Sequence, residues 1–136
     1  MDSNLEPVST DGAPEAIGPY SQAVICGGWI LTSGQIALDP ATQLMVDGGI
    51  QEQTHRVFQN LTAVMNAAGS SLADVARCTV YLKDMGDFAA VNAIYAEYFS
   101  SPYPARATIQ AAALPKDALV EIDCMAKVGH RRYGTR

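Results

Sequence analysis

The segment Val75–Lys83 (VARCTVYLK) alternates, residue by residue, between two kinds of side chain. Alanine, cysteine, valine and leucine lie on one side of the alternation, and arginine, threonine, tyrosine and lysine lie on the other. This period of two is typical of a β-strand with one face against a core. Apolar residues recur at helical spacing before this segment, over residues 50–68, and after it, over residues 88–99. A strand between two helices requires crossover connections, so the sequence predicts an α/β (α+β) fold with a mixed sheet.

Further strands are indicated on both sides of the two helices. Gly27-Gly28 is a two-residue hairpin signal between two apolar runs. Gly69 is placed to end the first helix. The expected strands are residues 22–26, residues 29–33, a short edge strand at 44–46, residues 75–83, residues 105–111 and residues 119–128.

Two helices can cover only one face of a six-stranded sheet. The strands nevertheless carry apolar residues on both faces, as in Val24-Ile25-Cys26 and Trp29-Ile30-Leu31. An uncovered apolar face is expected to pack against another protein surface. We therefore expect an oligomer in which the sheets face inward, most economically as a closed ring.

The composition describes one compact domain of 136 residues, of which 49% are hydrophobic and 17% are charged. We expect a flexible N-terminal arm over residues 1–16, a folded domain over residues 17–128 and a C-terminal tail over residues 129–136. A net charge of −5 and an isoelectric point of about 4.8 count against a nucleic-acid partner. No apolar run approaches the roughly 18 residues that a membrane span needs.

The three cysteines, Cys26, Cys78 and Cys124, all lie inside apolar strand-like runs. Buried, reduced thiols in a cytoplasmic protein are the simplest interpretation. His55 and His130 have no spacing typical of metal ligands, so no metal site is expected. The N-terminal residues lack a basic flank and an apolar core, so they do not resemble a signal peptide.

Arg106 stands among alanines in the strand expected at residues 105–111. A guanidinium in such surroundings is either solvated, or paired with a carboxylate of the protein, or free to bind the carboxylate of a ligand. If residues 105–111 and 119–128 form a hairpin, Glu121 lies opposite Ala111, on the order of 15 Å from Arg106. An ion pair within the hairpin is therefore not expected. A ligand or an acid of another subunit is the expected partner.

Five motifs in matching order resemble the reactive intermediate deaminase family (RidA, also called YjgF), and the similarity covers about residues 7–128. The motifs are Gly18–Val24, Thr32–Gln35, Asp87–Asn92, Pro104–Arg106 and Leu114–Ile122. The resemblance implies a chorismate-mutase-like fold and a homotrimer. In that trimer the sheets would line a central barrel, and the active sites would lie in clefts between subunits.

The resemblance also implies an activity, that of a 2-iminobutanoate/2-iminopropanoate deaminase. Such an enzyme hydrolyses reactive enamines and imines such as 2-aminoacrylate to 2-oxo acids and ammonia, and it needs no cofactor. Carried over by position, Arg106 would hold the substrate carboxylate and Glu121 would orient and activate the attacking water. Glu121 or Tyr20 would return a proton to the leaving amine. The residues implied to line the cleft are Tyr20, Ser33, Gly34, Asn92 and Thr108.

Several of these residues also have simpler interpretations. Tyr20 could pack over the first strand, Ser33-Gly34 could be only a strand end, and Asn92 could be solvated. Thr108 stands where many relatives carry cysteine, and it would contact the substrate mainly through its backbone. The deamination needs no thiol, so this difference does not count against the activity.

Two other functions remain open from the sequence. The same cleft could bind small 2-oxo acids without turnover, although a pure binding module has little use for Glu121 beside a substrate carboxylate. A ribonuclease or translation-inhibitor activity is attached to some relatives. The acidic charge and the lack of a basic, aromatic-lined groove count against that activity.

Overall fold

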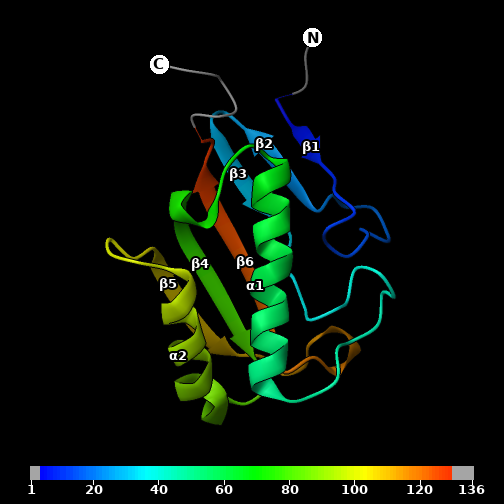
Figure 1. The fold of residues 1–136 in the computed structure, drawn as a ribbon, viewed down its shortest axis with the longest axis vertical. Coiled ribbons are helices and arrows are strands. Elements are labelled where there is room, and N and C mark those ends of the chain that lie inside the picture. Colours follow the sequence, from blue (N-terminus) through cyan, green and yellow to red (C-terminus); the bar gives the residue numbers. More distant parts are fainter. Residues whose placement is uncertain (1–3, 130–136) are drawn as a thin grey trace.

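The computed structural model describes residues 4–129, which form one six-stranded sheet in the order β1-β2-β3-β6-β4-β5 with two α-helices (Figure 1). Short 3-10 turns precede β4, α2 and β6. The mixed α+β sheet predicted from the sequence is confirmed. The elements are β1 Glu6–Val8, β2 Ala23–Cys26, β3 Trp29–Thr32, α1 Ile50–Ala67, β4 Val75–Leu82, α2 Phe88–Tyr98, β5 Ala105–Gln110 and β6 Val120–Lys127.

Strand β4 has a different partner at each of its edges. It pairs with β6 in antiparallel register and with β5 in parallel register, and α2 makes the crossover between the two parallel strands. The hairpin expected between residues 105–111 and residues 119–128 is therefore wrong, because β4 lies between these two strands. A strand that returns through a helix crossover pairs in parallel with the strand it left, which leaves only the other edge of β4 for β6.

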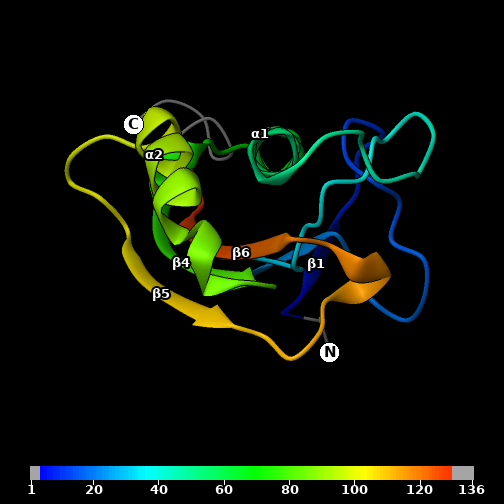
Figure 2. The ribbon, with the colours of Figure 1, turned by 90° about the horizontal axis from the view of Figure 1, so that it is seen from below.

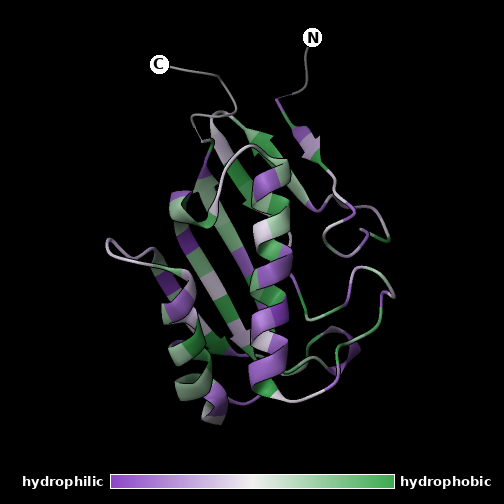
Figure 3. Cartoon of the chain, viewed as in Figure 1, coloured by the Kyte–Doolittle hydropathy of each residue, from purple (hydrophilic) through white to green (hydrophobic). Residues whose placement is uncertain are grey.

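Both helices lie on the same face of the sheet, as Figure 2 shows. The alternate residues Val120, Ile122, Cys124 and Ala126 of β6 point towards the helices and are buried. The side of α1 that faces away from the sheet is largely polar in Figure 3. Within residues 4–129, neither helix combines the length and the apolar character needed to cross a membrane. The helices thus serve to cover one side of the sheet.

Among residues 4–129, no helix covers the other face of the sheet, which is called here the open face. It carries large apolar side chains that stay exposed in the single chain, namely Trp29 (37% exposed), Leu31 (42%) and Ile109 (47%). An apolar surface of this kind fits the expected packing against further copies of the chain. The homotrimer itself stays a prediction.

Residues 4–16 are not the flexible arm expected from the sequence. Strand β1 pairs with β2, and Val8 and Ala13 are buried in the core. The buried side chain of Gln22 holds this segment, since its Oε1 accepts from the Thr10 backbone N–H while its Nε2 donates to the Thr10, Ala13 and Pro14 carbonyls. Every polar atom of the buried amide is used, and the segment is part of the folded domain.

The edge strand expected at residues 44–46 is also wrong. This segment makes only an isolated bridge between Met45 and Leu38, and the sixth strand of the sheet is β1 instead. Of the expected tail at residues 129–136, only Gly129 belongs to the described residues, where it is buried.

Helix α1 ends in the glycine motif that its sequence predicts. Gly69 has a φ of 79°, and its backbone N–H donates to the Asn66 carbonyl. The next residue, Ser70, donates its N–H to the Met65 carbonyl. These two bonds define a Schellman motif, which satisfies the last carbonyls of the helix and needs a left-handed residue at the glycine position.

The Gly69→Ala variant should lower the free energy of unfolding by about 1 kcal/mol, because a Cβ disfavours the left-handed conformation. Chemical denaturation measures this change. Gly69→Asn is the matched control and should lose less, since asparagine tolerates this conformation better than alanine. Equal losses for the two variants would show that the positive φ is not the source of the effect.

Candidate functional site

The two charged residues of the expected site lie on opposite faces of the sheet. Arg106 is aligned with the buried Cys78 of β4, so its side chain starts on the face covered by the helices. Glu121 is aligned with Tyr81 of β4, so its side chain starts on the open face. The two positions are also two strands and three residues apart, or about 14 Å. They cannot bind one small substrate together within one chain.

Arg106 is the centre of a group at the β5 edge, called here the anchor half-site (Arg106, Asn92 and Thr108). Its Nη1 donates a hydrogen bond of 2.7 Å to Asn92 Oδ1. Its guanidinium carbon lies 4.7 Å from the ring centre of Tyr95 and 5.4 Å from that of Phe88. Arg106 forms no ion pair with a carboxylate of residues 4–129, where Lys83 and Asp117 form the single ion pair. Neutral groups thus orient the exposed guanidinium, and its other donors can bind an anion.

The sequence interpretation missed the aromatic support of Arg106. Phe88, Asn92 and Tyr95 have the spacing i, i+4, i+7, which places them on one side of α2. In the sequence, Phe88 and Tyr95 cannot be distinguished from the other apolar residues that recur at helical spacing over residues 88–99. A polar residue set inside an apolar stripe, opposite a strand that carries an arginine, is the signal that would have found them.

Thr108 follows Arg106 by two residues on β5 and therefore starts on the same face. It is half-buried and aligned with Val80 of β4. The structure brings Thr108 and Asn92 together with Arg106. A contact of Thr108 with a substrate stays a prediction.

Glu121 belongs to a second group, called here the glutamate half-site (Tyr20, Ser33, Gly34 and Glu121). It is half-buried and lines a pocket of about 390 Å³ together with Tyr20 and Gly34. The other residues that line this pocket are Pro14, Glu15, Ile17, Gln22, Gln35, Ile36, Leu38, Gln43, Pro115 and Lys116. The pocket is mostly apolar with a few polar groups, as small-molecule sites usually are.

Gly34 makes room for the Glu121 carboxylate. A Cβ atom at position 34 would overlap the carboxylate Oε2 and would lie 2.8 Å from the carboxylate carbon. Any residue with a side chain would therefore displace the acid from its present place. The implied role of Gly34 in the cleft thus has a steric basis in this chain.

Burial raises the pKa of the Glu121 carboxyl above its usual range, and the negative charge of Asp123 raises it further. Within the described part of the chain, Glu121 forms no ion pair that would oppose this shift. A glutamate with a raised pKa is a better proton acceptor at neutral pH than an ordinary one. The arrangement suits a general base.

Tyr20 and Ser33 differ in how they relate to the pocket. Tyr20 is exposed and lines the pocket directly. Ser33 donates its Oγ–H to the Ser21 carbonyl over 2.6 Å, and its backbone N–H bonds to the Gln22 carbonyl. In the single chain Ser33 therefore fixes the segment that carries Tyr20 and does not line the pocket itself. Its contact with a substrate stays a prediction.

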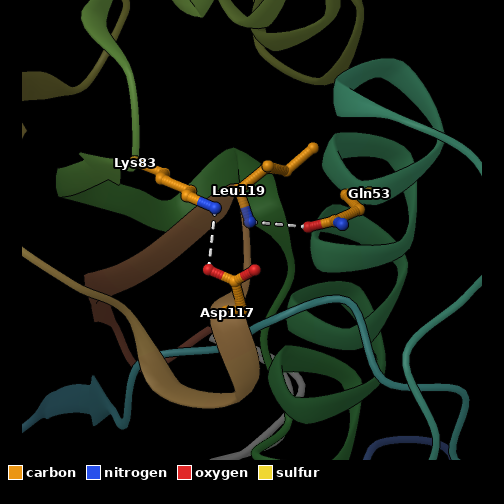
Figure 4. A network of polar contacts seen from close by, with 4 residues as sticks. All are labelled: Gln53, Lys83, Asp117 and Leu119. Carbon is orange, nitrogen blue, oxygen red and sulfur yellow. Dashed lines mark hydrogen bonds and ion pairs between the residues drawn. The ribbon is translucent and has the colours of Figure 1, made fainter.

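The segment before β6 is fixed by a small polar network (Figure 4). Lys83 Nζ pairs with Asp117 at 2.7 Å, and both side chains are largely exposed. The backbone N–H of Leu119 donates to Oε1 of the buried Gln53 on α1 over 2.9 Å. Lys116 and Asp117 both have left-handed backbones, with φ of 55° and 56°. The network therefore holds a strained turn at the rim of the Glu121 pocket.

The two parts of this network should contribute unequally to stability. Gln53→Leu leaves the Leu119 N–H without its partner and should cost about 1–3 kcal/mol of unfolding free energy. Lys83→Ala removes an exposed ion pair and should cost about 0–1 kcal/mol. Urea denaturation of both variants measures the difference. A larger loss for Lys83→Ala would contradict this ranking.

Because the pKa of Glu121 is raised by folding, the folded chain holds this proton more tightly than the unfolded chain does. Stability should therefore fall as pH rises from the unfolded pKa through the raised folded pKa. Glu121→Gln should remove this part of the pH dependence and should raise the melting temperature at pH 7. Thermal melts of both proteins between pH 4 and pH 8 provide the measurement, and a lower melting temperature for the variant at pH 7 would overturn the assignment.

Residues 4–129 contain no cluster of three or more histidine, cysteine, aspartate or glutamate side chains arranged to hold a metal ion. The groups that can act chemically at the two half-sites are a guanidinium, an amide, a phenol and a carboxyl. Together they can bind an anion and exchange protons with a ligand.

The family model described as Endoribonuclease L-PSP matches residues 10–128. A RutC family protein of Pyrococcus horikoshii is 50% identical over 121 residues, which cover 89% of this chain and 96% of that protein. A 2-iminobutanoate/2-iminopropanoate deaminase of Capra hircus is 47% identical over 122 residues, which cover 90% of this chain and 89% of that protein.

Solved structures agree with this likeness. RidA from the Antarctic bacterium Psychrobacter sp. is 44% identical with a TM-score of 0.87, covering 90% of this chain and 99% of that one. E. coli TdcF with bound serine is 37% identical with a TM-score of 0.83, covering 91% of this chain and 99% of that one. At these identities the likeness extends beyond the fold to the family.

Proposed function

Because the chain belongs to the RidA (YjgF) family, we propose that it hydrolyses 2-imino and 2-enamino acids, such as 2-aminoacrylate, to 2-oxo acids and ammonia. The observation that carries the proposal is Glu121. Its half-buried carboxyl has a raised pKa, opens into a pocket of small-molecule size and is free of an ion pair among the described residues. These are the properties of a base that activates water.

The substrate carboxylate binds at Arg106 of a neighbouring copy of the chain. Arg106 has no carboxylate partner among residues 4–129, and the sheet separates it from Glu121 of the same chain. A site assembled from the anchor half-site of one copy and the glutamate half-site of another brings the two groups together. The exposed apolar side chains of the open face support such an assembly.

The substrate reacts as its protonated imine, which an enamine such as 2-aminoacrylate forms when its β-carbon takes up a proton. Glu121 takes a proton from water while the water oxygen attacks the imine carbon, and the π electrons of the C=N bond move to the positively charged nitrogen, which yields a neutral carbinolamine. The protonated Glu121, or Tyr20, then donates a proton to the amine. Ammonia leaves as the C=O bond of the 2-oxo acid forms, and the carbinolamine hydroxyl gives its proton to the group that had protonated the amine. The bidentate grip of Arg106 on the carboxylate fixes the reacting carbon near the water.

Purified protein should accelerate the loss of 2-aminoacrylate or 2-iminobutanoate released by a pyridoxal-phosphate dehydratase, followed as 2-oxo acid and ammonia formation. Glu121→Gln should slow the reaction by about 10²–10⁴-fold, because it removes general-base catalysis. The wild-type rate should fall as pH decreases through the raised pKa of Glu121. Glu97→Gln is the matched control, since it makes the same change at an exposed glutamate of α2 outside both half-sites. Wild-type activity that Arg106→Ala leaves intact would sink the proposal.

A complementation experiment tests whether the site is shared between copies. Arg106→Ala and Glu121→Gln chains with different tags are co-expressed, and oligomers with both tags are purified. Each variant alone should be inactive, whereas a closed trimer that carries both tags should regain one of its three sites, or about one third, the site with Glu121 and Arg106 from complementary copies. Inactive mixed oligomers of wild-type mass would place both groups in one chain and contradict the shared site.

A binding module for small amino or oxo acids is the second candidate, and the serine held by E. coli TdcF favours it. This candidate predicts saturable binding of serine or 2-oxobutyrate without imine hydrolysis. Calorimetric titration beside the coupled assay separates the two functions.

The description Endoribonuclease L-PSP names a third activity. The net charge of −5 and the isoelectric point of about 4.8 count against it, because binding to phosphates depends on basic side chains. We therefore propose no action on RNA for this chain.

A further inference from the structure

Two buried thiols face each other in the core of the sheet, directly beneath the anchor half-site. Cys78 of β4 and Cys124 of β6 are aligned in the antiparallel register, and their sulfurs lie 3.5 Å apart. Cys78 is fully buried and Cys124 is 4% exposed. The deamination proposed above uses neither thiol.

The backbone places this pair in the register that a disulfide can bridge. The Cys124 N–H bonds to Thr32 Oγ1 on β3, and Ile122 on the same side of β6 exchanges both backbone bonds with Gln35. The peptide groups of Cys124 therefore point away from β4, which makes Cys78–Cys124 a non-hydrogen-bonded pair. Cα atoms of such pairs lie about 4.5 Å apart, and disulfides span Cα distances of about 4.4–6.8 Å.

The third cysteine cannot compete for either sulfur. Cys26 is aligned with Trp29, whose side chain is on the open face, whereas Cys78 and Cys124 point towards the helices. The sheet thus separates Cys26 from the pair. Closing the pair requires side-chain rotation only, since the strands are already in register.

We propose that Cys78 and Cys124 are a redox modification site that forms a reversible intramolecular disulfide in the folded protein. The oxidant is a hydroperoxide, and a small-molecule thiol is the reductant. This inference goes beyond the proposed deaminase function and does not depend on it.

The chemistry needs one peroxide for each disulfide. The Cys78 thiol loses its proton and the thiolate attacks a peroxide oxygen. The O–O bond breaks, Cys78 becomes a sulfenic acid, and the released hydroxide or alkoxide takes up the lost proton and leaves as water or an alcohol. The Cys124 sulfur then attacks the Cys78 sulfur, the S–O bond breaks, and the sulfenic hydroxyl leaves as water with the Cys124 proton. Cys78 is the attacking thiol because its hydrogen bond with the Cys124 thiol lowers its pKa, an effect that outweighs the opposing effect of burial, whereas the pKa of Cys124 is raised.

The disulfide is linked to the anchor half-site through Tyr95. The Tyr95 hydroxyl is buried and has no hydrogen-bond partner among residues 4–129, and its pKa is raised by burial and by the nearby Cys78. The ring of the same tyrosine supports the Arg106 guanidinium at 4.7 Å. Disulfide formation draws the Cys78 sulfur towards Cys124 and so changes the surroundings of the Tyr95 hydroxyl. Because the Tyr95 ring contacts Arg106, oxidation of the cysteines changes the environment of the guanidinium through this one side chain.

The test exposes folded wild-type protein and Cys26→Ser protein to hydrogen peroxide, alkylates the remaining thiols after denaturation, and maps the peptides by mass spectrometry. Both proteins should yield a linked Cys78–Cys124 peptide that dithiothreitol reverses, and the oxidised form should melt several degrees higher than the reduced form. Cys26→Ser is the matched control, since it removes the more exposed thiol and keeps the pair.

Cys124→Ala should stop the reaction at a Cys78 sulfenic acid, which dimedone traps. In NMR spectra of isotope-labelled protein, the Arg106 Nε–H resonance should shift when peroxide is added, and the same treatment of Cys78→Ala protein should not shift it.

Two results would overturn the proposal. One is that both thiols remain free to alkylate when Cys26 is fully oxidised. The other is that the linked peptide forms only in protein unfolded before oxidation.

Discussion

The two different pairings of strand β4, one at each edge, determine where the charged groups of the two half-sites lie. Antiparallel pairing to β6 on one edge and parallel pairing to β5 on the other place Arg106 and Glu121 at fixed positions relative to one strand. Because side chains alternate between faces, the two registers send the guanidinium and the carboxyl to opposite sides of the sheet. If one substrate binds to both groups, a second copy must supply one of them, and this requirement follows from the hydrogen-bond register alone.

The same sheet keeps two kinds of chemistry apart. On the covered face lie the anchor half-site and the paired thiols, next to the aromatic side chains of α2. On the open face lies Glu121, whose pKa is raised by burial and by a neighbouring acid. Because only neutral and aromatic groups of the described residues hold Arg106, its positive charge remains available to bind an anion. An arginine paired with Glu121 would instead lower the pKa of this carboxyl and make it a weaker base.

Local periodicity predicted both helices and five of the six strands, because periods of 2 and 3.6 are properties of a short segment. Which strands become neighbours was not predictable in this way. The turn near Lys116 suggested a hairpin, but β4 separates the two strands that flank it. The attachment of residues 4–16 to the domain was also missed, since it depends on the Gln22 amide and its distant backbone partners. At the site, Arg106 is conspicuous as a charge among alanines, and the role of Glu121 was implied by the family resemblance, whereas Phe88 and Tyr95 look like ordinary core residues in the sequence.

Gly34 shows how a position without a side chain can be as restricted as a catalytic residue. Its backbone has no unusual conformation that would require glycine, and the restriction comes from the Glu121 carboxylate that occupies the space beside it. In a saturation mutagenesis scan read out by activity, position 34 would have the intolerance profile of a residue that performs chemistry, although it contributes no functional group. In the same scan read out by protein abundance, many substitutions at position 34 would have little effect, because they displace the Glu121 carboxylate without disrupting the rest of the fold.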